Sequence, residues 1–346
     1  MIFDTADFDA HEAVHFASDA ATGLTAIVAI HSTHLGPAAG GTRWWEYADG
    51  EAALTDALRL SRGMSYKNAM AGLPMGGGKG VILRSAGVTK TDALLEAFGD
   101  VIESLGGRYV TAEDVGMTDH DMTVLARRTR HVSGLPVAAG AVGGNPGPST
   151  AEGVFLGMRA AIAHKLGRRD FAGLHVAIQG VGSVGGALAR RLAAAGAVLT
   201  LADVDAGRAV ALAAQLGATT AKVDAIAGVA ADVFSPNALG AGLDAATIAG
   251  LQVAVVAGAA NNQLATPGDG ARLAARGILY APDYVINAGG IISVVAEYLG
   301  QGAPADVTAA IARIEGRLAD IFAEGERSGV ATDAVADAMA RRLIGR

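Results

Sequence analysis

The strongest constraint on the fold lies at residues 175–203, where an apolar strand pattern, a glycine-rich turn and a helix pattern follow one another. The strand HVAIQ leads into GVGSVGG, in which Gly180, Gly182 and Gly185 have the spacing G-x-G-x-x-G. A second strand, VLTLAD, ends at Asp203, 18 residues beyond Gly185. These glycines permit a tight turn and allow a pyrophosphate to reach the N-terminus of the following helix. The segment therefore predicts a dinucleotide-binding βαβ unit.

The carboxylate of Asp203 predicts which dinucleotide is bound. It can accept hydrogen bonds from the hydroxyls of the adenine ribose, and its negative charge repels a 2′-phosphate. The sequence shows no arginine directly beside it. We therefore expect NAD rather than NADP as the cofactor.

Strand and helix patterns alternate through the second half of the chain. Besides the two strands above, short apolar strands are expected at 231–236, 253–258 and 277–282. Such alternation predicts a mostly parallel, doubly wound sheet that helices cover on both faces.

The first half has a different order of elements. Strands are expected at 12–16, 24–31 and 108–112, and helices at 51–63 and 91–105. Gly63 is expected to close the first of these helices.

An uncharged stretch rich in glycine and proline, 133–150, is the predicted hinge. A chain of 346 residues suits two domains. We therefore expect an α/β protein of two domains with a cleft between them. The expected domains are a substrate-binding, catalytic and oligomerisation domain at 1–140 and a Rossmann-type NAD-binding domain at 141–325. A C-terminal helix at about 325–346 is expected to pack back on the first domain.

Charge and residue types exclude several kinds of function. The net charge of −7 disfavours nucleic-acid binding, which uses a basic face. The chain contains no cysteine, so disulfides and thiolate sites are excluded. The first residues lack the pattern of a signal peptide, and polar residues interrupt the uncharged run at 245–268. We therefore expect a cytoplasmic protein without nucleic-acid or membrane partners.

The segment HEAVH at 11–15 matches the zinc-protease pattern H-E-x-x-H. That chemistry needs a helix, on which positions i and i+4 share one face. Here the segment is expected to be a strand, which would separate His11 and His15 by roughly 13 Å. We therefore expect no metal site.

The stretch GMSYKNAMAGLPMGGGKGV at 63–81 contains Lys67 and Lys79 in apolar, glycine-rich surroundings. The chain otherwise prefers arginine, with 22 arginines and five lysines. Arginine stays protonated at working pH, whereas a desolvated lysine can lose its proton and act as a base. Two ammonium groups close together in a partly dry cleft would also lower each other's pKa. We therefore expect functional lysines in this stretch.

Several motifs, in the same order, resemble one family over nearly the whole chain. They are LGPAAGGTR (35–43), GMSYKNAMAGLPMGGGKGVI (63–82), GGRYVTAEDVG (106–116), GNPGPSTAEGV (144–154), GVGSVGG (180–186), GAANNQL (258–264) and YAPDYVINAGGII (280–292). The sequence resembles the amino-acid dehydrogenases that act on leucine, valine and phenylalanine, which are distant relatives of glutamate dehydrogenase.

The resemblance implies a reaction and roles for residues of the first half. Lys67 would bind the substrate carboxylate with help from the backbone of Gly40 and Gly41. Lys79 would be the catalytic lysine, and Asp114 its acid/base partner. The implied reaction is the NAD-dependent, reversible oxidative deamination of an L-amino acid to a 2-oxo acid and ammonia, in which Lys79 activates the water that attacks an iminium. A homo-oligomer, a dimer or larger, is also expected.

The resemblance further indicates the side chain of the substrate. Ala39 stands where glutamate dehydrogenases have a lysine for the distal carboxylate, and Val294 replaces a hydroxyl. Together with Ala112 and Ile291 they would line an apolar pocket without a charge partner, which disfavours glutamate. Ala39 is smaller than the leucine usual in leucine enzymes, whereas Ile291 narrows the pocket. Leucine or valine is the expected substrate, and phenylalanine or tryptophan is the alternative. Asn262 is expected to lie near both substrate and cofactor.

The expected cofactor-binding residues combine the glycine turn with positions implied by the family. They are Ser149, Thr150, Gly180, Val181, Gly182, Ser183, Val184, Gly185, Asp203, Val204, Ala238, Ala260, Asn261, Asn262 and Asn287. The chain departs from the family at Trp44-Trp45 and at Asn237, where relatives often have cysteine. An alternative function of another class is a non-catalytic NAD-binding sensor on the same scaffold. The presence of Lys67, Lys79 and Asp114, the residues proposed for carboxylate binding and catalysis, disfavours this alternative.

Overall fold

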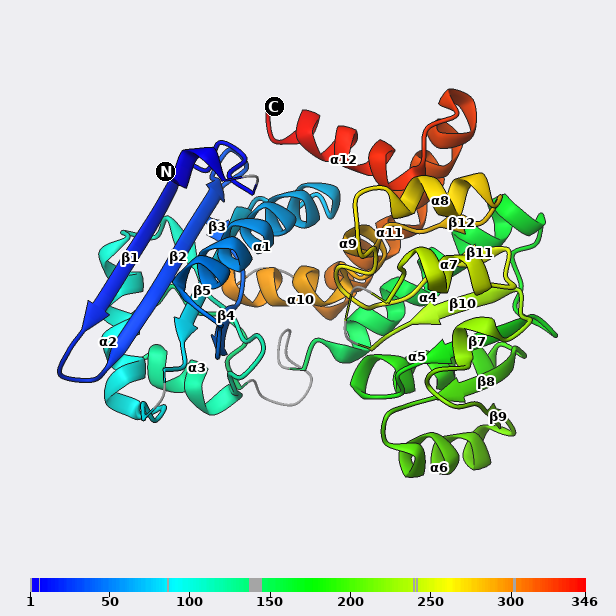
Figure 1. Cartoon of the computed structure of the whole chain (residues 1–346), viewed down its shortest axis with the longest axis horizontal. Coiled ribbons are helices and arrows are strands. Elements are labelled where there is room, and N and C mark those ends of the chain that lie inside the picture. The colour runs from blue at the N-terminus through cyan, green and yellow to red at the C-terminus, as the bar shows by residue number, and fades with distance from the viewer. Residues whose placement is uncertain are drawn as a thin grey trace. The chain divides into compact units, whose positions relative to one another are not determined.

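The structure is a computed structural model, and it describes residues 2–5, 7–85, 87–136, 145–238, 240, 242–300 and 303–346. It divides into two compact units, each with its own sheet (Figure 1). The first unit consists of Met1–Asn145, Ile291–Val307 and Ala340–Arg346, and the second of Pro146–Gly290 and Thr308–Met339. The expected two-domain α/β class is confirmed. The chain returns to the first unit at Ile291. The expected bounds of 1–140 and 141–325 do not include this return.

The first unit is built on a mixed sheet. Its elements are η1 (Ile2–Asp4), β1 (Ala13–Asp19), β2 (Leu24–Ser32), β3 (Ala38–Ala39), β4 (Thr42–Trp45), α1 (Gly50–Met70), β5 (Gly76–Leu83), α2 (Asp92–Ser104), β6 (Tyr109–Val110) and α3 (Asp119–Leu125). The strand order is β1-β2-β5-β3-β6, and β4 also pairs with β5. The strands expected at 12–16 and 24–31 and the helix expected at 91–105 are confirmed within a few residues.

Strand β2 is buried on both faces, which explains its continuous apolar run. Leu24, Val28 and Ile30 pack in one cluster with apolar residues of α2 and α3. Ile27 and Ala29 pack in another cluster with apolar residues of α1. Successive side chains of a strand point to opposite faces, so α1 covers one face of this sheet while α2 and α3 cover the other (Figure 1).

Helix α1 is longer than the sequence predicted. We expected Gly63 to close it, but the helix continues to Met70 and is followed by Gly72 in a left-handed conformation, with φ of 68°. Residues beyond Gly63, among them Ser65 and Ala69, are buried. Glycine inside a helix costs roughly 1 kcal/mol relative to alanine, and burial of the last turns outweighs that cost. As a result Lys67 lies on the helix rather than in a loop.

The second unit has a fully parallel sheet. Its elements are α4 (Gly147–Leu166), β7 (His175–Gln179), α5 (Ser183–Ala194), β8 (Val198–Ala202), α6 (Ala206–Leu216), β9 (Thr219–Thr220), η2 (Ile226–Gly228), β10 (Val233–Pro236), α7 (Ala245–Gly250), β11 (Val255–Val256), α8 (Asp269–Ala275), β12 (Leu279–Tyr280), α9 (Asp283–Ile286) and α11 (Pro304–Ser328). The order β12-β11-β10-β7-β8-β9 is the doubly wound dinucleotide-binding order read from one edge. All the strands expected in this half are confirmed, although most are shorter than expected. The short edge strand β9, which carries no apolar run, was not predicted.

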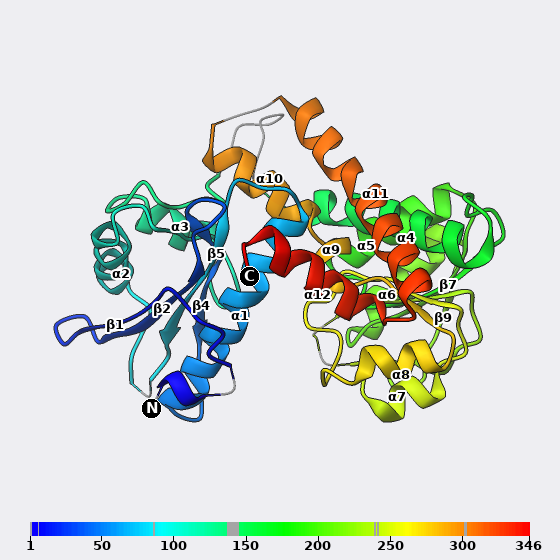
Figure 2. The same ribbon diagram turned by 90° about the horizontal axis from the view of Figure 1, so that it is seen from above.

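Three helices contribute residues to both units, since α11 begins in the first unit, to which its residues up to Val307 belong, and continues in the second. Helix α10 (Gly289–Tyr298) enters the first unit at Ile291, and α12 (Thr332–Leu343) enters it at Ala340. The last residues lie beside α1 in the first unit (Figure 2), where Arg341 pairs with Asp9 at 3.1 Å. Of the C-terminal segment expected at about 325–346, residues 340–346 group with the first unit and residues 325–339 with the second.

Residues 137–144 of the predicted hinge lie outside the described residues. In the part of the chain that the structure describes, no helix combines the length and the apolar character needed to cross a bilayer.

Candidate active site

Lys79 lies in the interior of β5, with strands paired on both sides of it. Its side chain is buried, and its ammonium group forms an ion pair with Oδ2 of Asp114. Burial lowers the pKa of Lys79 and the nearby positive charge of Arg43 lowers it further, whereas Asp114 opposes both. The structure therefore brings together the two residues predicted to be catalytic, in surroundings that favour loss of a proton from the lysine.

The glycines around Lys79 allow other parts of the protein to reach β5. A Cβ atom on Gly77 would lie 2.0 Å from the backbone nitrogen of Ser65, so α1 packs directly on the strand there. A Cβ atom on Gly41 would lie 2.8 Å from Cβ of Asp114. The glycine-rich sequence thus serves contacts within the protein, and these contacts hold α1 and Asp114 against the strand of Lys79.

Asp114 is held on both carboxylate oxygens. Oδ1 accepts a hydrogen bond from the backbone nitrogen of Val115 at 2.7 Å, and Oδ2 accepts from Lys79 and from Nε of Arg43, the latter at 3.2 Å. Burial by itself would raise the pKa of Asp114, but Lys79 and Arg43 outweigh it and hold that pKa below its usual value. Asp114 is therefore a fixed, ionised carboxylate.

Arg43 was missed by the sequence argument, which sought the positive neighbour of Lys79 in Lys67. It is the last residue of the motif LGPAAGGTR, so it was within a stretch already singled out. In the fold it lies on β4, which pairs in parallel with β5. Only that pairing places its guanidinium beside Asp114.

Lys67 lies half-buried near the end of α1, next to Asn68. The buried side chain of Asn68 donates hydrogen bonds to the backbone oxygens of Ala39 at 3.4 Å and Gly76 at 2.5 Å. Through Asn68 the end of α1 is tied to the strand that leads into Gly40 and Gly41. Gly40 also approaches this part of α1, since a Cβ atom on it would lie 3.1 Å from Cγ of Met64.

An apolar cluster contains part of the predicted substrate pocket. Ala39, Met75, Val110 and Val295 are buried together, and Ile291 packs against them. Ala39 and Ile291 are therefore brought together, although they are far apart in the sequence. Val295 lies one helical turn beyond Ile291 on α10, a spacing that could have revealed it.

Two further predicted pocket residues have other positions. Ala112 follows β6 and Val294 lies on α10, and both are half-buried. Neither belongs to this cluster among the described residues.

In the second unit, the glycine turn after β7 has the form that a pyrophosphate requires. Gly180 has φ of 87°, and a Cβ atom on Gly185 would lie 1.9 Å from the oxygen of Gly180. Gly182 begins α5 without a side-chain cap, and a Cβ atom there would meet no atom within 4 Å among the described residues. The first backbone N–H groups of α5 are thus available to an anion, and the turn fits a dinucleotide.

Asp203 follows β8 and reaches back to the glycine turn. Its Oδ2 accepts a hydrogen bond from the backbone nitrogen of Val181 at 2.7 Å. Contrary to expectation, an arginine does lie beside it, since Nη1 of Arg208 is 3.4 Å from Oδ1. Arg208 lies in the first turn of α6, whose start beside the end of β8 brings the two side chains together.

A cluster of amide side chains lies near the start of α4 in this unit. The buried Asn287 donates to the side-chain oxygen of Asn261 at 2.8 Å and to the oxygen of Ala259 at 3.0 Å, while its own Oδ1 has no hydrogen-bond partner among the described residues. Asn262 has φ of 52°, an uncommon backbone conformation for a residue other than glycine. A buried acceptor without a partner is suited to a ligand that donates a hydrogen bond.

Among the remaining predicted cofactor residues, Ser149 and Thr150 lie close to the start of α10. A Cβ atom on Gly289 would lie 2.0 Å from the oxygen of Ser149, and one on Gly290 would lie 2.6 Å from Oγ1 of Thr150. The other predicted positions differ mainly in exposure: buried Ala260, half-buried Val184, and exposed Ser183, Val204 and Ala238.

The departures at Asn237 and at Trp44-Trp45 have structural explanations. Asn237 donates to Ser235 at 2.9 Å and accepts from the backbone nitrogen of Ala259 at 2.9 Å, so it supports the loop beneath the glycine turn. Trp44 belongs to the buried core of the first unit, whereas Trp45 is exposed.

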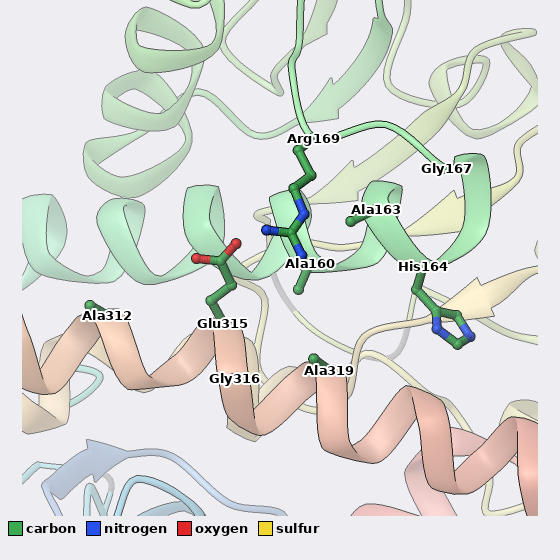
Figure 3. Close-up of a pocket in the computed structure, with 9 residues that line it drawn as sticks. All are labelled: Ala160, Ala163, His164, Gly167, Arg169, Ala312, Glu315, Gly316 and Ala319. Atoms are coloured by element: carbon green, nitrogen blue, oxygen red, sulfur yellow. The ribbon is translucent and has the colours of Figure 1, made fainter.

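A groove of about 550 Å³ lies between α4 and α11 in the second unit. Its floor consists mainly of alanine and glycine, with Arg169 and Glu315 at its sides (Figure 3). None of the predicted site residues lines this groove, so it is separate from the candidate site.

Comparisons with known proteins give consistent similarities. The family model described as "Glu/Leu/Phe/Val dehydrogenase, dimerisation domain" matches residues 9–131, and the one described as "Glutamate/Leucine/Phenylalanine/Valine dehydrogenase" matches residues 204–330. Leucine dehydrogenase of Thermoactinomyces intermedius is 44% identical over 346 residues, which cover 99% of this chain and 93% of that protein. Valine dehydrogenase of Streptomyces albus is 45% identical over 341 residues, covering 98% and 93%. The crystal structure of L-tryptophan dehydrogenase from Nostoc punctiforme matches with a TM-score of 0.85 at 41% identity, covering 96% of each chain.

Proposed function

Because the chain belongs to the Glu/Leu/Phe/Val dehydrogenase family, we propose that it catalyses the NAD-dependent, reversible oxidative deamination of leucine or valine to the 2-oxo acid and ammonia. The observation that carries this proposal is the buried ion pair of Lys79 and Asp114. A lysine whose pKa is lowered, held by an ionised carboxylate, is suited to proton transfer near neutral pH.

In the proposed mechanism the residues of the first unit handle the carboxylate and the protons. Lys67 binds the substrate carboxylate, assisted by the backbone of Gly40 and Gly41. The chemistry supplied by a bound nicotinamide is acceptance of a hydride from the substrate Cα. Lys79 takes a proton from the water that attacks the resulting iminium carbon, and Asp114 exchanges protons with the carbinolamine as ammonia leaves.

The proposed cofactor is NAD, and the proposal rests on Asp203. A 2′-phosphate would meet the carboxylate of Asp203, but the adjacent Arg208 reduces that repulsion. We therefore expect higher kcat/KM with NAD than with NADP, and a larger ratio in Arg208→Ser. Steady-state rates with the two dinucleotides at equal substrate concentration measure this ratio. Equal efficiency with both cofactors in the unmodified protein would contradict the assignment.

The proposed substrate class follows from the apolar cluster around Ala39 and Ile291, which offers no charge partner for a distal carboxylate. The small side chain of Ala39 leaves phenylalanine and tryptophan as the alternative substrates. The decisive assay measures absorbance at 340 nm with NAD and, in turn, leucine, valine, phenylalanine, tryptophan and glutamate. We expect the highest kcat/KM with leucine or valine and the lowest with glutamate. No reduction with any amino acid, together with measurable NAD binding, would favour the non-catalytic sensor instead.

Enlarging Ala39 tests the pocket directly. Ala39→Leu should lower turnover of phenylalanine relative to leucine by about tenfold, because a few added methylenes fill the space needed by the larger side chain. The ratio of the two kcat/KM values is the measurement. Ala39→Val serves as the milder variant, since a buried alanine tolerates only limited overpacking. A ratio that does not move in either folded variant would show that Ala39 does not contact the substrate side chain.

The protein is further proposed to act in the cytoplasm as a homo-oligomer. The description of the matching N-terminal family model as a dimerisation domain supports the oligomer.

A further inference from the structure

The ion pair of Lys79 and Asp114 is the inner part of a longer chain of charges in the first unit. Oδ2 of Asp114 accepts from Nε of Arg43 at 3.2 Å, and Nη1 of Arg43 donates to Oδ2 of Asp56 at 2.9 Å. The same oxygen of Asp56 accepts from the hydroxyl of Tyr47 at 2.6 Å. Neighbouring elements supply these groups: Arg43 is on β4, Asp56 on α1 and Lys79 on β5.

We propose that Arg43 is a positioning residue that fixes the Asp114 carboxylate. Its positive charge also compensates part of the negative charge of Asp114 and Asp56, which allows Lys79 to release its proton. This inference rests on the proposed function of Lys79 and Asp114. It adds a third residue, with a stated electrostatic task, to the proposed proton-transfer group.

Lys79 and Arg43 are positive, and Asp114 and Asp56 are negative, so the group is balanced when both cations are protonated. Without Arg43, two carboxylates would surround a single cation, and both would favour the protonated form of Lys79. With Arg43 present, part of their negative potential is compensated, and the lysine can become neutral at a lower pH.

Geometry makes Arg43 suited to this task in a way that lysine is not. Its guanidinium uses Nε toward one carboxylate and Nη1 toward the other, so a single planar group bridges Asp114 and Asp56. The side chains of Arg43 and Asp56 are 25% and 26% exposed, so solvent only partly screens this contact. Burial and the two carboxylates have opposite effects on the guanidinium, and the net result is a raised pKa of Arg43 that keeps it charged.

The other titratable groups around the pair come from the elements packed against it. They are Tyr47 after β4, Tyr109 on β6 and Glu113 beside Asp114. Burial raises the pKa of Tyr109 to about 12 and the pKa of Tyr47 beyond its usual range, so both stay neutral at working pH. Arg43 and Asp56 are therefore the fixed charges whose removal should act on Lys79 in opposite directions.

The test compares pH profiles of kcat for amino-acid oxidation in Arg43→Gln, Asp56→Asn and Arg43→Lys. The limb on which activity rises with pH requires neutral Lys79. Removing the positive charge of Arg43 favours protonated Lys79, so Arg43→Gln should move that limb to higher pH by about one unit or more. Removing the negative charge of Asp56 favours neutral Lys79, so Asp56→Asn should move it to lower pH. Arg43→Lys keeps the charge but loses the bridge, so its limb should stay near that of the unmodified protein while kcat falls.

If Arg43 had only a structural role, kcat would fall in these variants, but the limbs of Arg43→Gln and Asp56→Asn would not move in opposite directions along the pH axis. An unmoved limb in folded Arg43→Gln would overturn the inference. If that variant does not fold, as judged by circular dichroism, an unmoved limb in Asp56→Asn would do so.

A second readout separates this inference from the proposed function. The rate at which acetic anhydride acylates Lys79, followed by peptide mass spectrometry as a function of pH, reports its titration without turnover. Absence of amino-acid oxidation would contradict the proposed function but not the inference about Arg43. Opposite displacements of the acylation profiles in Arg43→Gln and Asp56→Asn would still support the role of Arg43, and unchanged profiles would refute it.

Discussion

Replacing Lys79 by arginine should lower kcat by at least about 100-fold, the lower end of the range for general acid–base groups. Arginine keeps the positive charge and most of the length of lysine, but it does not surrender a proton at any working pH. The Lys79 ammonium is buried and paired with Asp114, so the variant isolates proton transfer from charge. The measurement is kcat for amino-acid oxidation at saturating NAD and substrate, repeated from neutral pH to about pH 10, where raising the pH should not restore activity.

The controls for this variant address folding and cofactor binding. Lys79→Arg should bind NAD with nearly unchanged affinity, because the glycine turn and Asp203 belong to the second unit. Lys79→Ala should lose a similar amount of kcat without the added bulk. Near-normal turnover in Lys79→Arg, with an unchanged circular dichroism spectrum, would show that positive charge alone is required at this position.

Replacing Lys67 by alanine should chiefly raise the substrate KM, by about 30-fold or more. Loss of one partner of a desolvated charge pair costs about 2–5 kcal/mol, and each 1.4 kcal/mol is a factor of ten in affinity. The substrate carboxylate is present in both ground and transition states, so its binding should affect KM much more than kcat. Steady-state kinetics over a wide range of amino-acid concentration separates the two constants.

The chain offers a matched control lysine. Lys165 is exposed near the end of α4 in the second unit, so Lys165→Ala removes an equal charge and should leave both constants unchanged. If Lys67→Ala lowers kcat strongly at unchanged KM, Lys67 acts in the chemical step rather than in carboxylate binding.

The fold of the second unit could be read from local patterns. Apolar strands ending in a glycine turn or an acidic residue require only neighbouring residues to be recognised, and β7 was predicted with its bounds. Edge strand β9 was missed because it is short and exposed, so burial left no apolar run in its sequence. Helix α1 was predicted too short because burial against β5 compensates for Gly63, and propensity does not include that contact.

The candidate site likewise combines residues that the sequence indicated with contacts that arise only in the fold. The sequence by itself identified the dinucleotide turn, and it indicated Asp203 and the two lysines as candidate site residues, because their chemistry is expressed in residue type and spacing. Only the tertiary structure decided that Arg43 bridges Asp114 and Asp56, that Arg208 pairs with Asp203, and that Val295 lies in the cluster with Ala39. These pairings depend on strand register and on helix packing. In the first unit they bring together side chains that are distant in the sequence, and in the second unit the start of α6 places Arg208 beside Asp203, five residues earlier. Electrostatic effects on a pKa fall off with distance in space, so the charge environment of Lys79 was set by folding rather than by its neighbours along the chain.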